Sequence, residues 1–305
     1  MCAMSPTPQP GIFAVGTRSH HHLQLDVAPD ADPRALLGAL RDVRELATTV
    51  AGVNLVIGFG SELCQRVASR WLPADVTPFA TIEGADGVTI PADQHDLWVW
   101  LHSSGPDGVF DLARHADAAL RGLATVATEQ PSFTYQDSRD LTGFEDGTEN
   151  PPVDEAIDLV AVPEGRPGAG SSVVLLQRWA HDLEAFEALD DDAKDQVIGR
   201  RLTTGDELDA SVRSPRAHIS RVVLTGGDGG ELEVFRRSTT YGGVLEHGLE
   251  FLAFSPDVDR LTAMLHRMVG TDDGLRDHLT DISRCTASAW YVAPPVEAFA
   301  ATGDR

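Results

Sequence analysis

One short, turn-rich segment contains several residues that could do chemistry. Residues 141–152 have the sequence LTGFEDGTENPP, in which Gly143 and Gly147 flank Asp146 in a Gly-x-x-Asp-Gly pattern. Glycines adopt backbone angles closed to other residues and let a bulky, flat group approach the main chain. We therefore expect a rigid turn to hold the Asp146 carboxylate where it can accept and return a proton. A solvated acidic turn and a calcium loop are the alternatives, but the alternating oxygen ligands of a calcium loop are missing.

Histidine is a common ligand of metals in proteins, and the chain has 11 histidines. His218 stands out because it precedes an apolar, strand-like run at residues 221–224, and His247 is its rival. Residues 20–22 (HHH) lie in an alternating segment that predicts a strand, whose side chains point to opposite faces. We interpret these three histidines as part of an exposed strand and not as a metal site.

Segments along nearly the whole chain resemble one known family, the dye-decolourising peroxidases, and most closely their compact bacterial (type B-like) branch. Residues 143–151 (GFEDGTENP) resemble the family's distal haem motif, and residues 217–221 (AHISR) resemble its proximal-histidine segment. Residues 235–242 (FRRSTTYG) and 247–254 (HGLEFLAF) resemble its distal-arginine strand and the strand that follows. Residues 277–294 (DHLTDISRCTASAWYVAP) resemble its closing segment.

The resemblance implies haem b as the cofactor and gives individual residues a role. His218 corresponds to the axial ligand, Asp146 to the distal acid–base residue and Arg236 to the distal arginine. Asp281 lies where relatives have a carboxylate near the proximal histidine, and Arg221 is expected to reach a haem propionate. The resemblance also places a further group of residues around the cofactor on the distal side: Gly143, Glu145, Gly147, Thr148 and Ser238.

The activity implied by the resemblance is reduction of hydrogen peroxide via a ferryl intermediate, followed by oxidation of bulky dyes, phenols or metal ions. Asp146 would move a proton between the peroxide oxygens, and Arg236 would stabilise the developing negative charge. Many relatives have an asparagine two residues after the distal arginine. This chain has Ser238 there, a shorter side chain with a single donor. Arg237 is the next residue on the strand, so we expect it to face the opposite way, at the surface or an interface.

Two other functions are compatible with the same residues. A haem-binding protein that stores haem or releases its iron would share the pocket and show incidental peroxidase activity. A metal-dependent hydrolase could use the carboxylates of residues 145–150 (EDGTEN), and a purified protein without a haem Soret band would favour it. Electrons from bulky donors would enter a haem peroxidase through aromatic side chains, for which the candidates are Tyr135, Trp179, Tyr241 and Trp290.

The elements that must position these residues occur in the same order in the two halves of the chain. Alternating apolar residues predict strands and 3.6-residue periodicity predicts helices. The first half is predicted to contain strands at 20–27, 55–59, 97–101 and 132–136 and helices at 33–47 and 109–126. The second half is predicted to contain strands at 172–178, 232–236, 249–254 and 289–293 and helices at 183–199 and 257–269.

This repeated order predicts an α+β protein made of two tandem ferredoxin-like (βαββαβ) modules with antiparallel sheets, and haem bound in the C-terminal half. We expect a disordered arm over residues 1–10, an N-terminal module over 11–142 and a distal-motif loop and connection over 143–170. A C-terminal haem-binding module over 171–295 and a tail over 296–305 complete the division. That tail shows no apolar segment of the kind that directs some relatives into protein nanocompartments.

Composition limits the partners. The net charge of −23 opposes binding to nucleic acid and to anionic membranes, and no apolar run approaches the length of a membrane span. The three cysteines are far apart in the sequence, which favours a reducing cytoplasm. The expected partners are hydrogen peroxide and a small-molecule or dye reductant. The resemblance further implies a homo-oligomer, from dimer to hexamer.

Overall fold

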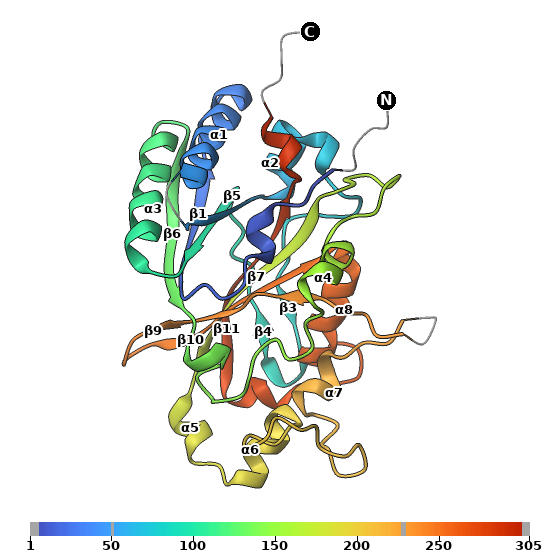
Figure 1. Cartoon of the computed structure of the whole chain (residues 1–305). Coiled ribbons are helices and arrows are strands. Elements are labelled where there is room, and N and C mark those ends of the chain that lie inside the picture. The colour runs from blue at the N-terminus through green and yellow to red at the C-terminus, as the bar shows by residue number, and fades with distance from the viewer. Residues whose placement is uncertain (1–5, 50–51, 227–229, 301–305) are drawn as a thin grey trace.

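The computed structural model describes residues 6–49, 52–226 and 230–300, and its elements follow the predicted repeat (Figure 1). The first half contains β1 (Ser19–Val27), α1 (Pro33–Thr49), β2 (Asn54–Phe59), α2 (Ser61–Val67), β3 (Ile82–Glu83), β4 (Thr89–Ile90), β5 (Leu97–Ser103), α3 (Pro106–Leu120) and β6 (Ala124–Phe133). The second half contains α4 (Val153–Val160), β7 (Ser172–His181), α5 (Leu183–Glu187), α6 (Asp191–Ile198), α7 (His218–Val222), β8 (Phe235–Arg236), β9 (Thr239–Gly242), β10 (His247–Ser255), α8 (Val258–Val269) and β11 (Ser283–Ala293). Short 3₁₀ helices connect them: η1 (Pro10–Phe13), η2 (Ser69–Trp71), η3 (Ala85–Gly87), η4 (Gln136–Ser138), η5 (His278–Asp281) and η6 (Val296–Phe299).

The strand order confirms two ferredoxin-like modules. In the first half the strands lie in the order β2-β5-β1-β6, and in the second half in the order β11-β7-β10-β9. Every neighbouring pair is antiparallel, as expected for this arrangement. The two modules join through β2 with β11 and through β6 with β9. Within the described residues they therefore form one nine-stranded sheet, which the β7–β10 pairing closes on itself.

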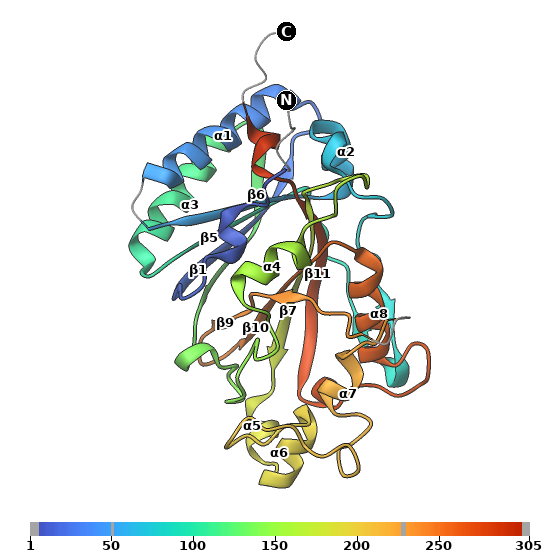
Figure 2. The same cartoon turned by 45° about the vertical axis from the view of Figure 1, so that its right-hand side comes forward.

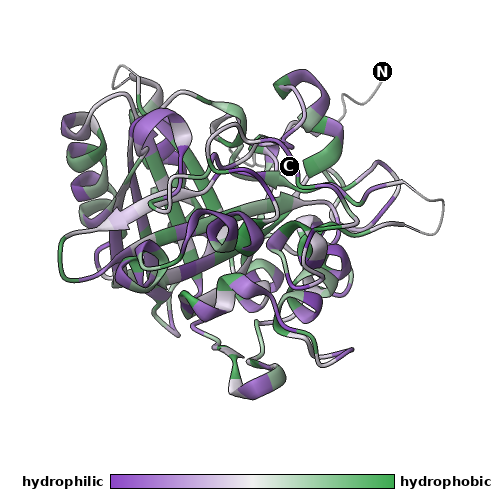
Figure 3. Ribbon diagram, turned by 90° about the horizontal axis from the view of Figure 1, so that it is seen from below, coloured by the Kyte–Doolittle hydropathy of each residue, from purple (hydrophilic) through white to green (hydrophobic). Residues whose placement is uncertain are grey.

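Closure of the sheet divides the core into two layers. On the outer face, strand residues such as Leu97, Val99 and Leu101 pack against α1 and α3, which lie together on one side of the first module (Figure 2). On the inner face, alternate residues of the same strand, Trp98 and Trp100, pack together with residues of β2, β7, β10 and β11. Both faces of β2 and β5 are therefore almost fully buried. Figure 3 shows hydrophobic and hydrophilic stretches side by side in the strands at the centre of the molecule.

Several predicted boundaries were wrong for local reasons. The helix expected over 183–199 is two helices, because the Asp190 side chain accepts a hydrogen bond from the Ala193 amide and starts a new helix. The helix expected over 109–126 ends at Leu120, since Gly122 adopts a φ of +82° and turns the chain into β6. The run at 221–224 is not a strand: α7 covers its first two residues.

The expected N-terminal arm is packed where the structure describes it. Residues 1–5 of that arm lie outside the described part of the chain. Gln9, however, is fully buried and its amide donates to the carbonyls of Ile57 and Pro294. The last part of the expected tail, residues 301–305, also lies outside the described residues, whereas Phe299 packs into the core. Across 6–49, 52–226 and 230–300, no helix has the length and apolar character needed to span a bilayer.

The three consecutive histidines of β1 are buried, so the expectation of an exposed strand was wrong. His20 and His22 point to the inner face of the closed sheet, opposite His102 and Trp100 on β5. Burial lowers the pKa of His20 to about 4 and that of His102 to about 2, and it holds the pKa of His22 well below the usual 6.5. These three imidazoles are therefore neutral in the folded protein.

We predict a steep loss of stability in acid from these neutral histidines. Below pH 6.5 His20, His22 and His102 bind protons in the unfolded chain but stay neutral in the folded protein, because their pKa values are lowered there. Their stabilisation is complete above that pH and is lost as the pH falls toward 4, by up to about 4 kcal/mol per pH unit for the three together. Urea unfolding at a series of pH values measures this slope. His102→Gln should reduce it by about 1.4 kcal/mol per pH unit, whereas His115→Gln, exposed on α3, should not. Equal slopes for all three proteins would contradict the prediction.

Candidate active site

The loop before α4 holds Asp146 in the rigid turn that the sequence predicts. Gly143 and Gly147 adopt φ values of +92° and +74°, which side chains other than glycine rarely allow. The Arg139 guanidinium donates to the Gly143 carbonyl at 2.8 Å. The Asp146 amide donates to the carbonyl of Ser138 at 3.0 Å. These hydrogen bonds to the backbone therefore fix the position of the Asp146 main chain, from which the carboxylate extends.

The turn that anchors Asp146 is itself strained. Gln136, Asp137 and Ser138 have φ values of 27°, 49° and 69°, three successive non-glycine residues with positive φ. Such conformations each cost on the order of 1–3 kcal/mol and persist where the surrounding structure enforces them. This turn places the Ser138 carbonyl where it accepts from the Asp146 amide, and Asp137 lines the same cavity as Asp146.

Asn150, which the sequence analysis missed, ties the loop to the strand that carries Arg236. Its amide oxygen accepts from the Arg236 backbone amide at 2.9 Å, and its amide nitrogen donates to the Arg236 carbonyl at 2.7 Å. An asparagine three residues after a motif glycine is a recognisable turn signal, but its long-range partner cannot be read from the sequence. This reciprocal pair sets Arg236 beside Asp146.

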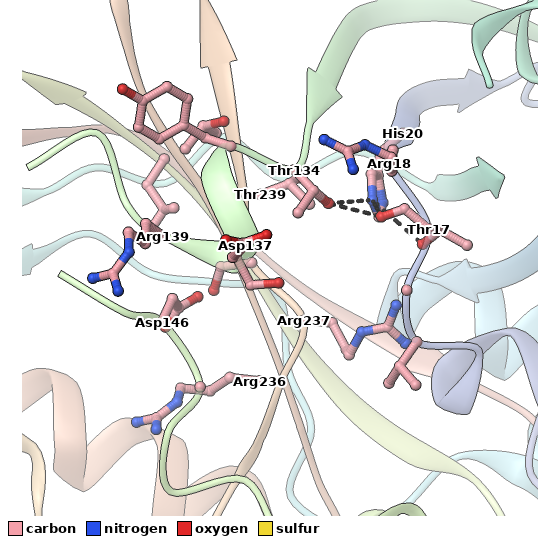
Figure 4. A pocket seen from close by; sticks show the side chains of 18 of the residues that line it. Thr17, Arg18, His20, Thr134, Asp137, Arg139, Asp146, Arg236, Arg237 and Thr239 are labelled. Atoms are coloured by element: carbon pink, nitrogen blue, oxygen red, sulfur yellow. Dashed lines mark hydrogen bonds between the residues drawn. The ribbon is translucent and has the colours of Figure 1, made fainter. Parts of the chain in front are cut away.

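Two polar groups of this region are buried without a partner among the described residues. They are the Arg236 Nε and the Ser238 Oγ. A buried donor without a hydrogen bond costs about 1–3 kcal/mol, so such groups usually await a ligand or water. Asp146, Arg236 and Ser238 line a cavity of about 390 Å³, and Figure 4 shows Asp146, Asp137 and Arg236 entering it from separate segments.

Arg237 is not at the surface as expected. Its guanidinium donates to the carbonyls of Ile12, by a short bond, and of Ala14 at 2.8 Å, and it lies over the ring of Trp100. The guanidinium faces the inner side of the closed sheet, so both faces of its strand are covered. Burial lowers the pKa of Arg237 to about 10, which still leaves it charged at neutral pH.

His218 is the first residue of α7, and its ring is oriented by a buried carboxylate. The Nδ1 of His218 lies 2.7 Å from the Oδ2 of Asp277, whose side chain is fully buried. The other oxygen of Asp277 accepts from the Leu279 amide at 2.7 Å. A carboxylate acts only as an acceptor, so Nδ1 carries the hydrogen and the lone pair of Nε2 is free. No described residue hydrogen-bonds that Nε2.

The expectation that Asp281 is the carboxylate next to the proximal histidine was wrong. Asp281 instead accepts from Arg216 at 3.0 Å and forms ion pairs with Arg276 and His278. Asp277 caps the start of the 3₁₀ helix that ends at Asp281. With about three residues per turn, side chains four apart in such a helix do not share a direction. Both aspartates lie in the segment that resembles the family, and only the geometry of the helix cap shows that Asp277 is the one that contacts His218.

The remaining expected residues divide between the cavity and other roles. Arg221 was expected to reach a propionate, but it is buried and donates to the carbonyl of Arg267 and to Asp273, so that expectation was wrong. The rival ligand His247 bonds the Gly243 carbonyl in a separate surface groove. Gly143 shapes the turn through its positive φ, and a Cβ at this position would lie 3.4 Å from the Leu202 side chain. Glu145 and Thr148 are exposed at the outer edge of the cavity beside His218.

An apolar cavity separates the distal pair from His218. Asp146 and Arg236 line one part of it and His218 lines another, with hydrophobic walls between them. These walls are Val222, Leu249, Phe251, Met264, Leu265, Met268 and Leu279. The residues that line the cavity suit haem chemically. They provide an imidazole with a free Nε2, apolar walls for a flat ring, and polar groups without partners on the opposite side. Trp179 also lines this cavity, Tyr135 lines the distal cavity, and Tyr241 and Trp290 are buried.

The described residues do not provide the ligands that a metal-dependent hydrolase would need. Over residues 6–49, 52–226 and 230–300, no group of three or more His, Cys, Asp or Glu side chains is arranged to hold a metal ion. Glu149 of the EDGTEN segment is instead paired with Arg200 at 2.6 Å. The carboxylates of this segment therefore do not converge.

Comparison with known families gives two matches that together span most of the chain. Residues 9–134 match the family described as Dyp-type peroxidase, N-terminal, and residues 137–298 match Dyp-type peroxidase, C-terminal. The chain is 32% identical over 300 residues to a dye-decolorizing peroxidase of Mycolicibacterium paratuberculosis. That match covers 95% of this chain and 84% of the relative.

Solved structures agree with these matches. A Dyp-type peroxidase protein from Shewanella oneidensis superposes with a TM-score of 0.91 at 26% identity, covering 98% of this chain and 99% of that one. A variant of DypB from Rhodococcus jostii, solved in complex with heme, superposes with a TM-score of 0.84 at 29% identity. It covers 99% of this chain and 98% of that one.

Proposed function

The chain belongs to the Dyp-type peroxidase family, and from that premise we propose that His218 holds its haem iron while Asp146 and Arg236 activate hydrogen peroxide. Members of this family are haem-dependent peroxidases, so the chain is an enzyme of that class. The observation that carries the assignment of residues is that Asp146, Arg236 and His218 line one apolar cavity together.

Each of the three residues has a distinct task in the proposed reaction. Haem, when bound, supplies the redox centre at which the O–O bond of peroxide breaks and to which reductants later give electrons. His218 anchors the iron through Nε2, and the Asp277 carboxylate at Nδ1 orients the ring and raises its basicity. Asp146 takes a proton from one peroxide oxygen and returns it to the other. Arg236 stabilises negative charge on peroxide, for which its unpartnered Nε is available.

Ser238 provides a hydrogen-bonding hydroxyl for small molecules in the distal cavity. Its buried hydroxyl has no hydrogen-bond partner among the described residues, so it can hold a water or a peroxide oxygen beside Arg236. The cavity of about 390 Å³ lies within the usual range of small-molecule pockets. We therefore propose that peroxide enters here, and that phenols, dyes or metal ions are the electron donors.

The optical spectrum of the purified holoprotein, with and without peroxide, tests this function. We expect a haem Soret band that shifts on addition of peroxide and returns when a phenol or dye is added, with many turnovers per haem. A haem-handling protein would instead release haem or iron without peroxide and give few turnovers. A protein that does not retain haem would overturn the proposal.

We also propose a cytoplasmic homo-oligomer, between dimer and hexamer. Cys64 and Cys285 are free and buried, which suits a reducing compartment. The hairpin between β9 and β10 exposes Val244 and Leu245 almost completely, at 95% and 100%. Two adjacent apolar side chains at a hairpin tip favour contact with another protein surface. Light scattering of the purified protein measures the number of copies.

A further inference from the structure

The inner face of the closed sheet holds a stack of aromatic rings beside the distal cavity. The rings of Trp100 and His102 lie 4.1 Å apart, and that of His20 lies 5.8 Å from Trp100. The stack continues from Trp100 to Trp98 at 6.1 Å and on to Tyr291 at 5.9 Å. All five side chains are buried. His20 also lines the distal cavity, so the stack reaches that cavity through this imidazole.

Each tryptophan of the stack donates its indole N–H to a histidine. Trp100 Nε1 lies 3.3 Å from His20 Nδ1, and Trp98 Nε1 lies 3.3 Å from the corresponding nitrogen of His22. The other ring nitrogen of His20, Nε2, lies 3.2 Å from the Thr17 carbonyl, which can only accept. Nε2 therefore carries the hydrogen, and Nδ1 offers a lone pair to the indole. A pKa of about 4 keeps this imidazole neutral at working pH.

The two tryptophan–histidine pairs differ in whether a proton can leave. His20 lines the distal cavity together with Asp146, and its Nε2 lies near the hydroxyls of Thr17 and Thr134 (Figure 4). His22 is enclosed, and its Nε2 is buried without a partner among the described residues. A proton accepted by His22 would leave an unpaired charge inside the barrel, which is costly. Of these two pairs, only Trp100–His20 reaches the distal cavity.

The charge of Arg237 makes the proton step necessary. Its guanidinium carbon lies 5.1 Å from the centre of the Trp100 ring. An oxidised indole that kept its N–H proton would be a second cation at this distance, in a buried place where like charges repel strongly. Loss of the proton removes that charge from the ring. Tyr291 has no such outlet, because its hydroxyl donates to the Gln24 amide oxygen at 2.7 Å, and an amide is not a base at neutral pH.

We propose that Trp100 and His20 form a proton-coupled electron donor to the peroxide-oxidised active site, an inference that rests on the proposed function. Trp100 gives one electron to the oxidised site, for which hydrogen peroxide is the oxidant. The indole N–H bond breaks and its proton binds Nδ1 of His20, while the Nε2–H bond of His20 breaks and its proton passes to a water molecule in the distal cavity. A neutral Trp100 radical results. A phenol that later gives one electron and one proton restores the indole.

Rapid freezing of the holoenzyme after mixing with peroxide, without a reductant, tests the proposal by electron paramagnetic resonance. We expect a tryptophan radical whose hyperfine pattern changes when ring-deuterated tryptophan is incorporated, and which lacks an exchangeable N–H coupling. Trp100→Phe should abolish this signal. Trp98→Phe is the matched control, since it removes the neighbouring ring of the same stack and should retain the signal.

The acceptor is tested by a second matched pair. His20→Gln keeps a hydrogen-bond acceptor but no base, so the radical should be lost or should retain its N–H coupling. His22→Gln should behave as the unmodified enzyme. A signal that survives in Trp100→Phe, or a tyrosine radical in the unmodified enzyme labelled with deuterated tryptophan, would overturn the inference. If peroxide does not change the haem spectrum at all, the proposed function fails instead.

Discussion

Replacement of His218 by alanine is expected to yield a folded protein that has lost its haem. The Asp277 carboxylate leaves the Nε2 lone pair of His218 free, and no other histidine lines the apolar cavity in the same way: His181, which also reaches it, is bonded at both nitrogens. Removal of a carboxylate that orients a metal-bound histidine typically costs 10–100-fold in affinity. We expect about that loss for Asp277→Asn, and a larger one for His218→Ala. The ratio of Soret to protein absorbance after gel filtration measures both.

His247→Ala is the matched control for the ligand. His247 was the rival candidate, but its ring bonds the Gly243 carbonyl at 2.9 Å and lies in a separate groove. This variant should retain haem like the unmodified protein. Normal haem content and spectrum in His218→Ala, or haem loss confined to His247→Ala, would show that the ligand is misassigned.

The reaction with peroxide is expected to slow by about 10²-fold or more when either distal residue is neutralised. Asp146→Asn removes the base that moves the peroxide proton, and Arg236→Leu removes the charge that stabilises the leaving oxygen. Both side chains border the distal cavity and the apolar cavity, so neither substitution should expel the haem. Stopped-flow absorbance of the Soret band against peroxide concentration gives the second-order rate constant for each variant.

Two other residues that line the same cavity provide matched controls, since each carries the same charge as the distal residue it controls for. Asp137→Asn changes the neighbouring carboxylate of the same cavity, and asparagine tolerates the φ of 49° at this position. Arg18→Leu removes a guanidinium that borders the cavity away from Asp146. Both should react with peroxide within a few-fold of the unmodified rate. A rate equal to the unmodified one in Asp146→Asn or Arg236→Leu would remove that residue from the proposed mechanism.

Local patterns in the sequence predicted the repeated order of strands and helices well. The alternation of residues 97–101 and the periodicity of α1 and α8 come from contacts within single elements, which the sequence displays directly. The order βαββαβ in each half then limits the sheet to the observed antiparallel arrangement. The predicted element boundaries were wrong where a single residue sets the end of a helix. Asp190 starts α6, and Gly122 turns the chain after α3.

The candidate site was predicted in part. Asp146, Arg236 and His218 were identified by resemblance to a family motif, and the structure brings their side chains to one cavity. Asn150 and Asp277 were missed because their importance lies in contacts 86 and 59 residues away in sequence. No pattern in the sequence distinguishes Asp277 from Asp281, since only the capped turn decides which carboxylate faces the imidazole.

The sequence by itself determined which residues alternate along each strand and, through its resemblance to a family, which residues are candidates for the chemistry. The tertiary structure alone decided which strand faces are covered. Residues 20–22 and Arg237 were expected at the surface because a half-buried strand alternates between core and water. Closure of the two sheets into one barrel buries the second face as well. Whether a strand face meets water depends on strands far away in the sequence, and that dependence is why its neutral histidines and stacked tryptophans could not be foreseen.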